Sequence, residues 1–215
     1  MNTEDEDAAR TISPELREIA RRRGLVAAAG HRGDEASIRA YLADPSAPVR
    51  ATALAALVRA GVATSADGAA AGADPDQEVR RVACELAPAL PGADYLALLG
   101  DPAPVVVEAA AFALGEVVAV EAVPRLSEVA RQHRDPLCRE SAVAALGAIG
   151  DEAALPAILA ALGDRPAIRR RATLALAPYE GPEVDAALQR SLVDKDWQVR
   201  QAAEDLLGPE ASRPG

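Results

Sequence analysis

The chain has 215 residues and a formal net charge of −10; half of its residues are hydrophobic, but only 2% are aromatic. Its apolar residues are mostly Ala, Leu and Val, which suits helices packed through small side chains and argues against a sheet core rich in aromatic and β-branched residues. The acidic balance disfavours nonspecific binding to DNA or to anionic membranes, because both need a clustered basic surface.

The N-terminal segment and the cysteines bear on the compartment of the protein. The start, MNTEDEDAAR, is acidic and polar, unlike the basic and then apolar start of a signal peptide. No apolar run approaches the roughly 20 residues of a membrane span. Cys84 and Cys138 lie inside apolar helical patterns, so we expect buried thiols in a reducing compartment. We therefore predict a cytoplasmic protein with a disordered acidic tail over 1–12 and a disordered tail over 209–215.

The first predicted helix spans residues 14–30. Ser13 is a favourable N-cap, and Pro14 occupies the first helical position, where proline is tolerated. Beyond this helix, the segment DPSAPVRATALAALVRAG (44–61) combines an Asp-Pro turn, an apolar helical pattern and a closing glycine. Similar segments begin at Asp74, Asp101, Asp135, Asp164 and Asp194.

These six segments recur at a nearly fixed period. Their first strong apolar residues are 27 to 32 residues apart, a spacing typical of a solenoid built from helical repeats. The six residues are Val49, Val79, Val106, Cys138, Ile168 and Val199.

A second helical pattern lies within each period, most clearly over 150–164 and 181–194. A glycine that ends one helix is followed by an aspartate that can cap the next, as at Gly150 and Asp151. We therefore predict one domain over 13–208, in which an N-terminal helix precedes six helical hairpins. The predicted bounds of the repeats are 34–61, 62–91, 92–118, 119–150, 151–180 and 181–208.

The repeated motif is D-P-x-x-x-V-R-x-x-A-x-x-A-L followed by G-D-x-x-A, and it stands most fully at 44–57 and 135–155. It resembles the HEAT-repeat family, in particular the short bacterial HEAT-like repeats of the phycobilin-lyase-subunit type. The resemblance implies an all-α fold, a right-handed α-solenoid in which the second helix of each hairpin lines a concave groove. The segment 63–74 departs from the pattern, because Gly68 and Gly72 replace a bulky apolar face, so we expect a softer second repeat.

An arginine follows the first apolar residue in all copies but the third, and three of these copies carry an aspartate six residues earlier. Such a row could grip an anionic ligand, or each guanidinium could bond an aspartate of its own or a neighbouring repeat. We favour the second interpretation, a structural Asp–Arg ladder, because a feature that recurs in nearly every repeat serves the architecture. The ladder residues are Asp44, Arg50, Asp74, Arg80, Arg139, Arg169, Asp194 and Arg200.

The positions two and six residues after the first apolar residue point away from the core at about 100° per residue. The first copy carries only Ala51 and Ala55 there, whereas later copies place Phe112 and Leu174 on either side of the small Ala144. An apolar strip with a charged rim suits an amphipathic helix or an extended peptide; the alternative is that Phe112 packs sideways against a neighbouring helix. The predicted groove residues are Arg81, Glu85, Glu108, Phe112, Glu140, Ala144, Arg170, Arg171, Leu174, Gln201 and Asp205.

The sequence carries no local motif for catalysis, metal binding or cofactor binding. His31 and His133 lack a second ligand at helical spacing, and there is neither a glycine-rich phosphate loop nor a His-Glu pair of the kind found in HEAT-type di-iron hydroxylases. We therefore predict no catalytic residue, no metal and no cofactor.

The predicted function is that of a non-catalytic adaptor or scaffold, a monomer that binds a protein or peptide and no membrane, with nucleic acid disfavoured. Two alternatives follow from the resemblance. One is a chromophore-handling subunit like those of the phycobilin lyases. The other is a HEAT-like DNA glycosylase, which would need a basic groove with aromatic residues.

Overall fold

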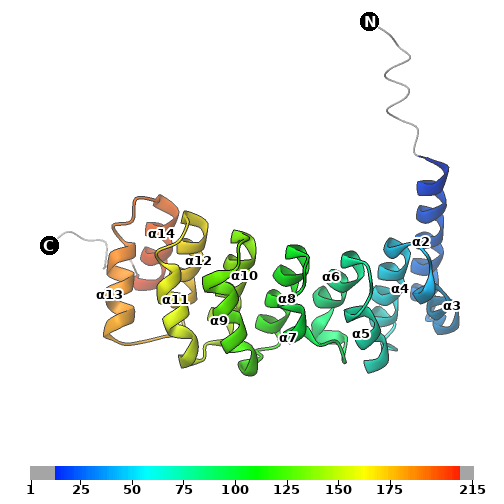
Figure 1. Cartoon of the computed structure of the whole chain (residues 1–215), viewed down its shortest axis with the longest axis horizontal. Helices are drawn as coiled ribbons and strands as arrows, with labels where there is room; N and C mark the ends of the chain where they lie inside the picture. The colour runs from blue at the N-terminus through cyan, green and yellow to red at the C-terminus, as the bar shows by residue number, and fades with distance from the viewer. Residues whose placement is uncertain (1–12, 209–215) are drawn as a thin grey trace, which may run out of the picture. The chain divides into compact units, whose positions relative to one another are not determined.

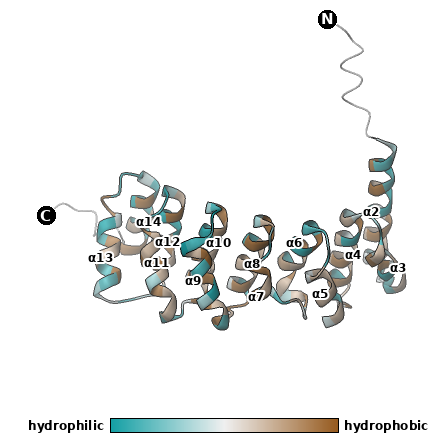
Figure 2. Ribbon diagram, viewed as in Figure 1, coloured by the Kyte–Doolittle hydropathy of each residue, from teal (hydrophilic) through white to brown (hydrophobic). Residues whose placement is uncertain are grey.

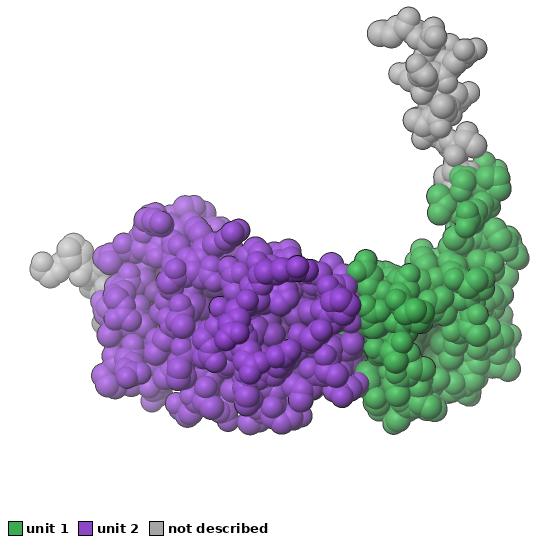
Figure 3. Space-filling view, in the orientation of Figure 1, with its two compact units in different colours: residues 1–93 green, residues 94–215 purple. Residues whose placement is uncertain are grey.

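The computed structural model describes residues 13–208, so the tails predicted over 1–12 and 209–215 lie outside it. Within the described range the chain is helical and has no β-strand (Figure 1). Contacts between residues divide the chain into two compact units, unit 1 (1–93) and unit 2 (94–215) (Figure 3). The single domain over 13–208 stays a prediction.

Unit 1 contains an N-terminal helix and two helical hairpins. Its elements are α2 (Pro14–Arg32), α3 (Glu35–Ala40), the 3-10 turn η1 (Tyr41–Ala43), α4 (Ala47–Arg59), α5 (Ser65–Gly72), α6 (Gln77–Glu85) and the 3-10 turn η2 (Ala87–Ala89). α2 packs against α4, and α4 packs against α6, so these three helices form one layer. α3 and α5 form hairpins with α4 and α6 respectively.

The two ends of α2 are fixed by local hydrogen bonds. Ser13 Oγ accepts a hydrogen bond from the Leu16 N–H at 3.2 Å, as expected of an N-cap. The helix continues past residue 30 to Arg32, and Gly33 ends it in the left-handed region at φ 67°. Gly30 instead allows close packing, because an added Cβ would lie 3.0 Å from the Cβ of Ala56. The predicted end of this helix was therefore too early.

The second repeat contains the short helix α5, and its glycines have a packing role. Gly68 is buried, and a Cβ added there would lie 2.0 Å from the carbonyl oxygen of Pro91. Gly92 takes a φ of 92° and would place a Cβ 2.1 Å from the carbonyl oxygen of Ser65. The backbones of α5 and of the segment after η2 therefore touch directly, and only glycine fits there.

Unit 2 contains four helical hairpins. Its elements are α7 (Tyr95–Leu98), α8 (Pro104–Glu116), η3 (Val120–Ala122), α9 (Val123–Gln132), α10 (Pro136–Ile149), η4 (Glu152–Ala154), α11 (Leu155–Ala161), α12 (Pro166–Ala175), α13 (Pro182–Ser191) and α14 (Trp197–Leu207). α8, α10, α12 and α14 pack side by side in one layer, and each pairs with the helix that precedes it (Figure 1). With the two hairpins of unit 1, the six predicted hairpins are all present in the described chain.

Small residues bring the helices of this layer close together. A Cβ added to Gly147 of α10 would lie 2.7 Å from the Cα of Ala175 on α12, and one added to Gly115 of α8 would lie 3.0 Å from the Cα of Ala145. Figure 2 shows α8 as hydrophobic along most of its length. The close packing expected from the alanine-rich composition is confirmed in unit 2.

Candidate partner-binding groove

Three arginines of the Asp–Arg ladder bond an aspartate of the following repeat through two parallel hydrogen bonds. Nε and Nη2 of Arg50 donate to the Asp74 carboxylate at 2.9 and 2.7 Å. Two further pairs have the same geometry: Arg139 with Asp164 at 2.8 and 2.9 Å, and Arg169 with Asp194 at 2.8 and 2.7 Å. This planar two-bond geometry is the one that suits guanidinium and carboxylate groups.

The remaining guanidinium nitrogen, Nη1, bonds a main-chain carbonyl in the loop that precedes the arginine's own helix. Arg50 donates to the carbonyl of Asp44 at 2.9 Å, and Arg139 donates to that of His133 at 2.8 Å. Equivalent bonds reach Asp74 from Arg80 at 2.7 Å, Asp164 from Arg169 at 2.9 Å and Asp194 from Arg200 at 2.7 Å. These arginines therefore tie helices to the loops between them, within a repeat and to the next one.

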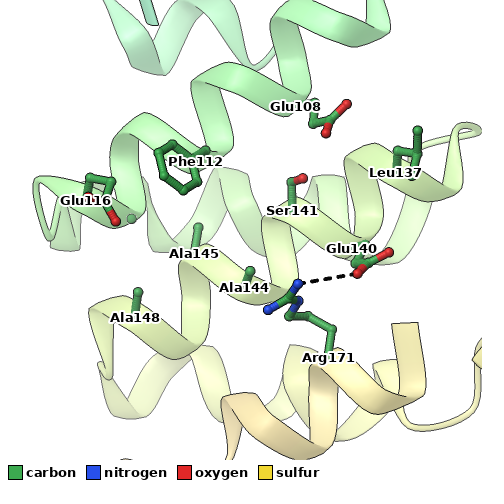
Figure 4. Close-up of a pocket in the computed structure, with 11 residues that line it drawn as sticks. Glu108, Phe112, Glu116, Leu137, Glu140, Ser141, Ala144, Ala145, Ala148 and Arg171 are labelled. Atoms are coloured by element: carbon green, nitrogen blue, oxygen red, sulfur yellow. Dashed lines mark ion pairs between the residues drawn. The ribbon is translucent and has the colours of Figure 1, made fainter. Parts of the chain in front are cut away.

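An open hollow of about 360 Å³ lies in unit 2 between α8, α10 and α12 (Figure 4). From α8, Glu108, Phe112 and Glu116 face it at intervals of four residues, so they share one side of the helix. Phe112 is 59% exposed, which leaves most of its ring uncovered. The α8 wall is therefore one aromatic ring between two carboxylates.

The α10 wall of the hollow is small and mostly apolar. Leu137, Ser141, Ala144 and Ala148 follow one another along the same side of α10, and Ala145 adds to the floor. Leu137 is 56% exposed at the start of the helix. Apart from Leu137 at the start of the helix, the apolar side chains that α10 presents to the hollow are all alanines.

The charges around the hollow are mainly negative. Glu140 forms an ion pair with Arg171 of α12 at 3.5 Å (Figure 4). Glu108 and Glu116 form no ion pair with any residue in the described part of the chain. Three carboxylates against one guanidinium leave the lining with a net charge of about −2 at neutral pH.

The structure brings together five of the predicted groove residues: Glu108, Phe112, Glu140, Ala144 and Arg171. Leu174, which is 37% exposed, and Arg170 lie on α12 but do not line the hollow. Gln201 and Asp205 lie on α14 and bond each other at 2.9 Å, also outside it.

Two other predicted groove residues lie in unit 1. Arg81 and Glu85 of α6 form an ion pair with each other, and Arg81 also bonds Glu78 at 2.8 Å. Ala51 occupies in the first repeat the position that Arg81 occupies in the second. It is buried in the core of unit 1 beside Ala47, so it does not face outward as the helical projection predicted.

Sequence reasoning missed Leu137, Ser141 and Ala148. The helical projection counted only positions two and six residues after Cys138. These three residues, with Ala144, lie at steps of four, three and four along α10, which is a stripe on one side of a helix. This stripe could have been recognised in the sequence, but it begins at Leu137, one residue before Cys138, from which the outward positions were counted.

The described residues offer neither a metal site nor a membrane span. Within residues 13–208, no group of three or more His, Cys, Asp or Glu side chains is placed to hold a metal ion. None of the described helices is both long and apolar enough to cross a bilayer.

Comparison with known proteins supports the fold. Residues 93–177, which hold α7 to α12 and the whole hollow, match the family model for HEAT repeats. The X-ray structure of YibA from Escherichia coli is similar over 90% of this chain and 74% of its own, with a TM-score of 0.57 and 15% sequence identity. With the stacked hairpins, these matches identify an α-solenoid, of which residues 93–177 match HEAT repeats. The phycobilin-lyase-type subfamily stays a prediction.

Two further likenesses are weaker. Human deoxyhypusine hydroxylase, in complex with glycerol, is 23% identical over 88% of this chain and 78% of its own, with a TM-score of 0.47. A designed armadillo repeat protein in complex with the peptide (KR)4 is 17% identical over 94% of this chain and 95% of its own, with a TM-score of 0.48. Neither reaches a TM-score of 0.5, so they say nothing of what this chain does. No curated protein sequence matches the chain.

Proposed function

We propose that this protein is a non-catalytic adaptor or scaffold that binds a segment of another protein in the hollow between α8 and α10. The observation that carries the proposal is the exposed ring of Phe112 above a floor of alanines. An aromatic side chain offers about 200 Å² for burial, so covering the exposed 59% of Phe112 would contribute about 3 kcal/mol before the costs of association.

The electrostatics of the hollow favour a protein partner over a nucleic acid. Its unpaired carboxylates, Glu108 and Glu116, would repel a phosphate backbone, whereas they would attract basic side chains. The nearby Cys138 thiol is a poor nucleophile, because burial, first, and the charges of Asp135 and Glu108 raise its pKa to about 11. The first observation supports a protein partner, and the second gives no support to a cysteine nucleophile at this surface.

Site-specific crosslinking tests this proposal in the native host. A photoreactive phenylalanine analogue is placed at Phe112 and, as a matched control, at Val193, an exposed apolar residue outside the hollow. We expect a discrete crosslinked partner from position 112 and none of the same mass from position 193. The partner is then identified and purified, and its affinity is measured.

The purified partner gives the decisive measurement. We expect Phe112→Arg to raise its Kd by at least about tenfold, because the ring is lost and an ill-fitting charge is introduced, while Val193→Arg leaves the Kd unchanged. Equal binding by a folded Phe112→Arg variant, or the same crosslinks from both positions, would refute the use of this surface.

A further inference from the structure

The α8 wall of the hollow carries acid, aromatic and acid residues in regular succession. Glu108 and Glu116 are eight residues apart with Phe112 midway between them, so the two acidic residues are separated by about 12 Å along the helix axis. All three side chains turn toward the hollow (Figure 4). A partner that buries the ring of Phe112 therefore meets a carboxylate about one helical turn away on either side.

These two carboxylates differ from the third one in the lining. Glu140 is neutralised by Arg171, but no residue in 13–208 forms an ion pair with Glu108 or Glu116. Covering an unpaired carboxylate with an apolar surface is unfavourable, because the charge loses water and gains no partner. The occupant must therefore bring its own cations to these two positions.

The lining also indicates the backbone conformation of the occupant. An extended peptide presents unpaired N–H and C=O groups, which need hydrogen-bonding side chains along the groove. Among the residues that line the hollow, Ser141 is the only neutral side chain with a hydrogen-bonding group. A helix satisfies its own backbone groups, and the alanines of α10 allow it to approach closely.

We propose that the groove takes an amphipathic α-helix of a partner protein, with an apolar residue that covers Phe112 and a Lys or Arg about one turn to each side. The cations lie at positions i and i+8 of the partner helix and the apolar residue lies at i+4, matching Glu108, Glu116 and Phe112. The hollow receives the apolar side chain and leaves the partner backbone outside. This assignment rests on the proposed function and names the chemistry of its partner.

Synthetic helical peptides test this assignment directly. The first peptide carries Lys, Leu and Lys at positions i, i+4 and i+8 in an alanine and glutamine background. A second peptide has the same composition with both Lys on the opposite side of the helix, and a third has a central proline that prevents helix formation. Binding to the full-length protein is measured by fluorescence anisotropy at low and high salt.

We expect the first peptide to bind with a Kd of about 100 µM or tighter and to weaken as salt rises. The other two peptides should bind at least about tenfold more weakly. The Glu108→Gln/Glu116→Gln variant should also lose about tenfold in affinity for the first peptide, because both ion pairs are removed. Glu121→Gln/Glu180→Gln, which removes two exposed carboxylates outside the hollow, is the control and should bind normally.

Three results would overturn the assignment: no binding by the first peptide, equal binding by the proline peptide, or equal binding by the Glu108→Gln/Glu116→Gln variant. None of these results contradicts the proposed function if Phe112→Arg still weakens binding of the partner identified by crosslinking. Loss of the proposed function is recognised separately, by a partner that binds wild type and Phe112→Arg equally well.

Discussion

Single carboxylates determine how the Asp–Arg ladder responds to acid. Hydrogen bonds from Arg139 hold the pKa of Asp164 below its ordinary value of 3.8, and those from Arg169 lower the pKa of Asp194 in the same way. A folded-state pKa below the unfolded value means that the folded protein binds the proton less readily. The resulting stabilisation is complete above pH 3.8 and is lost as the pH falls through the folded pKa.

Replacing Asp164 by Asn tests this at one pair. Near neutral pH we expect the free energy of unfolding to fall by about 2 kcal/mol, because the charged acceptor of Arg139 is lost. The difference from wild type should narrow as the pH falls below 3.8, because the unfolded chain then takes up a proton at Asp164 more readily than the folded protein does. Urea unfolding followed by circular dichroism gives the free energy of unfolding of wild type and variant near neutral pH and below pH 3.8.

The control for this experiment is Asp205→Asn. The exposed Asp205 carboxylate accepts a hydrogen bond from Gln201 at 2.9 Å and forms no ion pair in the described chain, so its replacement should change stability little at either pH. An Asp164→Asn effect that is equally large at both pH values would contradict the ionic origin of the stabilisation.

The arginines of the ladder could be predicted from the sequence, but not all of the aspartates that they bond. Three copies show an aspartate six residues before the arginine, whereas the carboxylate that is bonded lies 24 or 25 residues after the arginine. Asp164 precedes Arg169 by only five residues, so the spacing of six residues did not identify it as a ladder residue. Arg22 of α2, which pairs with Asp44 at 3.3 Å, lies outside the repeats altogether.

Among the helices, α8 ends in an unusual way. Gly33, Gly61 and Gly150 follow α2, α4 and α10 with φ between 67° and 69°. After α8 the corresponding residue is Val118, with a φ of 52°. Its N–H donates to the Gly115 carbonyl at 3.1 Å, in the same helix-ending arrangement that Gly61 makes with Val58 at 3.0 Å. A β-branched side chain in this region costs about 1–2 kcal/mol.

Replacing Val118 by Gly should therefore stabilise the protein. We expect a gain of about 0.5–1 kcal/mol, because the strain is relieved, the half-exposed side chain contributes little packing, and glycine loses some chain entropy. Thermal unfolding measures the change. The reverse substitution, Gly150→Val, should lower stability by at least about 1 kcal/mol; a Val118→Gly variant that unfolds at or below the wild-type temperature would contradict the strain.

Helix ends and helix sides were predictable to different degrees. Glycine after an apolar run located the ends of α4 and α10, because left-handed backbone there favours glycine. The end of α8 lacked that signal. The side of α10 that faces the hollow was missed in part, because which residues of a helix stay exposed depends on how its two neighbours pack, and periodicity alone does not contain this.

At the scale of the whole molecule, the repeats differ in how much apolar surface they bury. α5 has eight residues and buries only Gly68 and Ala71, whereas α10 has 14 residues and buries six, all of them apolar. Local opening requires less free energy where few apolar contacts are broken. The softer second repeat expected from the sequence therefore has a physical basis in the short α5, although its glycines are tightly packed.

Hydrogen exchange measured by mass spectrometry tests this difference. We expect the amides of α5 to exchange at least about tenfold faster than those of α10, with α12 closer to α10. The comparison uses peptides from one sample of the full-length protein, so stability and conditions are matched. Equal protection of α5 and α10 would contradict the expected local softness.

The period of the sequence was sufficient to predict the hairpins, because each repeat contains the same pattern of turn residues, apolar stripe and helix cap. It was insufficient for the groove, which exists only where copies differ. Phe112 was identifiable as an aromatic residue at an outward position. Within residues 13–208, Glu108 and Glu116 form no ion pair, whereas Glu140 pairs with Arg171 of the next helix. Because Arg171 belongs to the following repeat, this difference is not visible in the sequence of one repeat.

The direction of the ladder has a consequence for how such a chain lengthens in evolution. Arg139 and Arg169 each reach forward to the aspartate of the next repeat, at the same separation of 25 residues. Duplication of one whole period would therefore supply each new arginine with an acceptor and leave the existing pairs intact. An insertion of part of a period would separate a donor from its acceptor, so the ladder tolerates changes of length only in whole repeats.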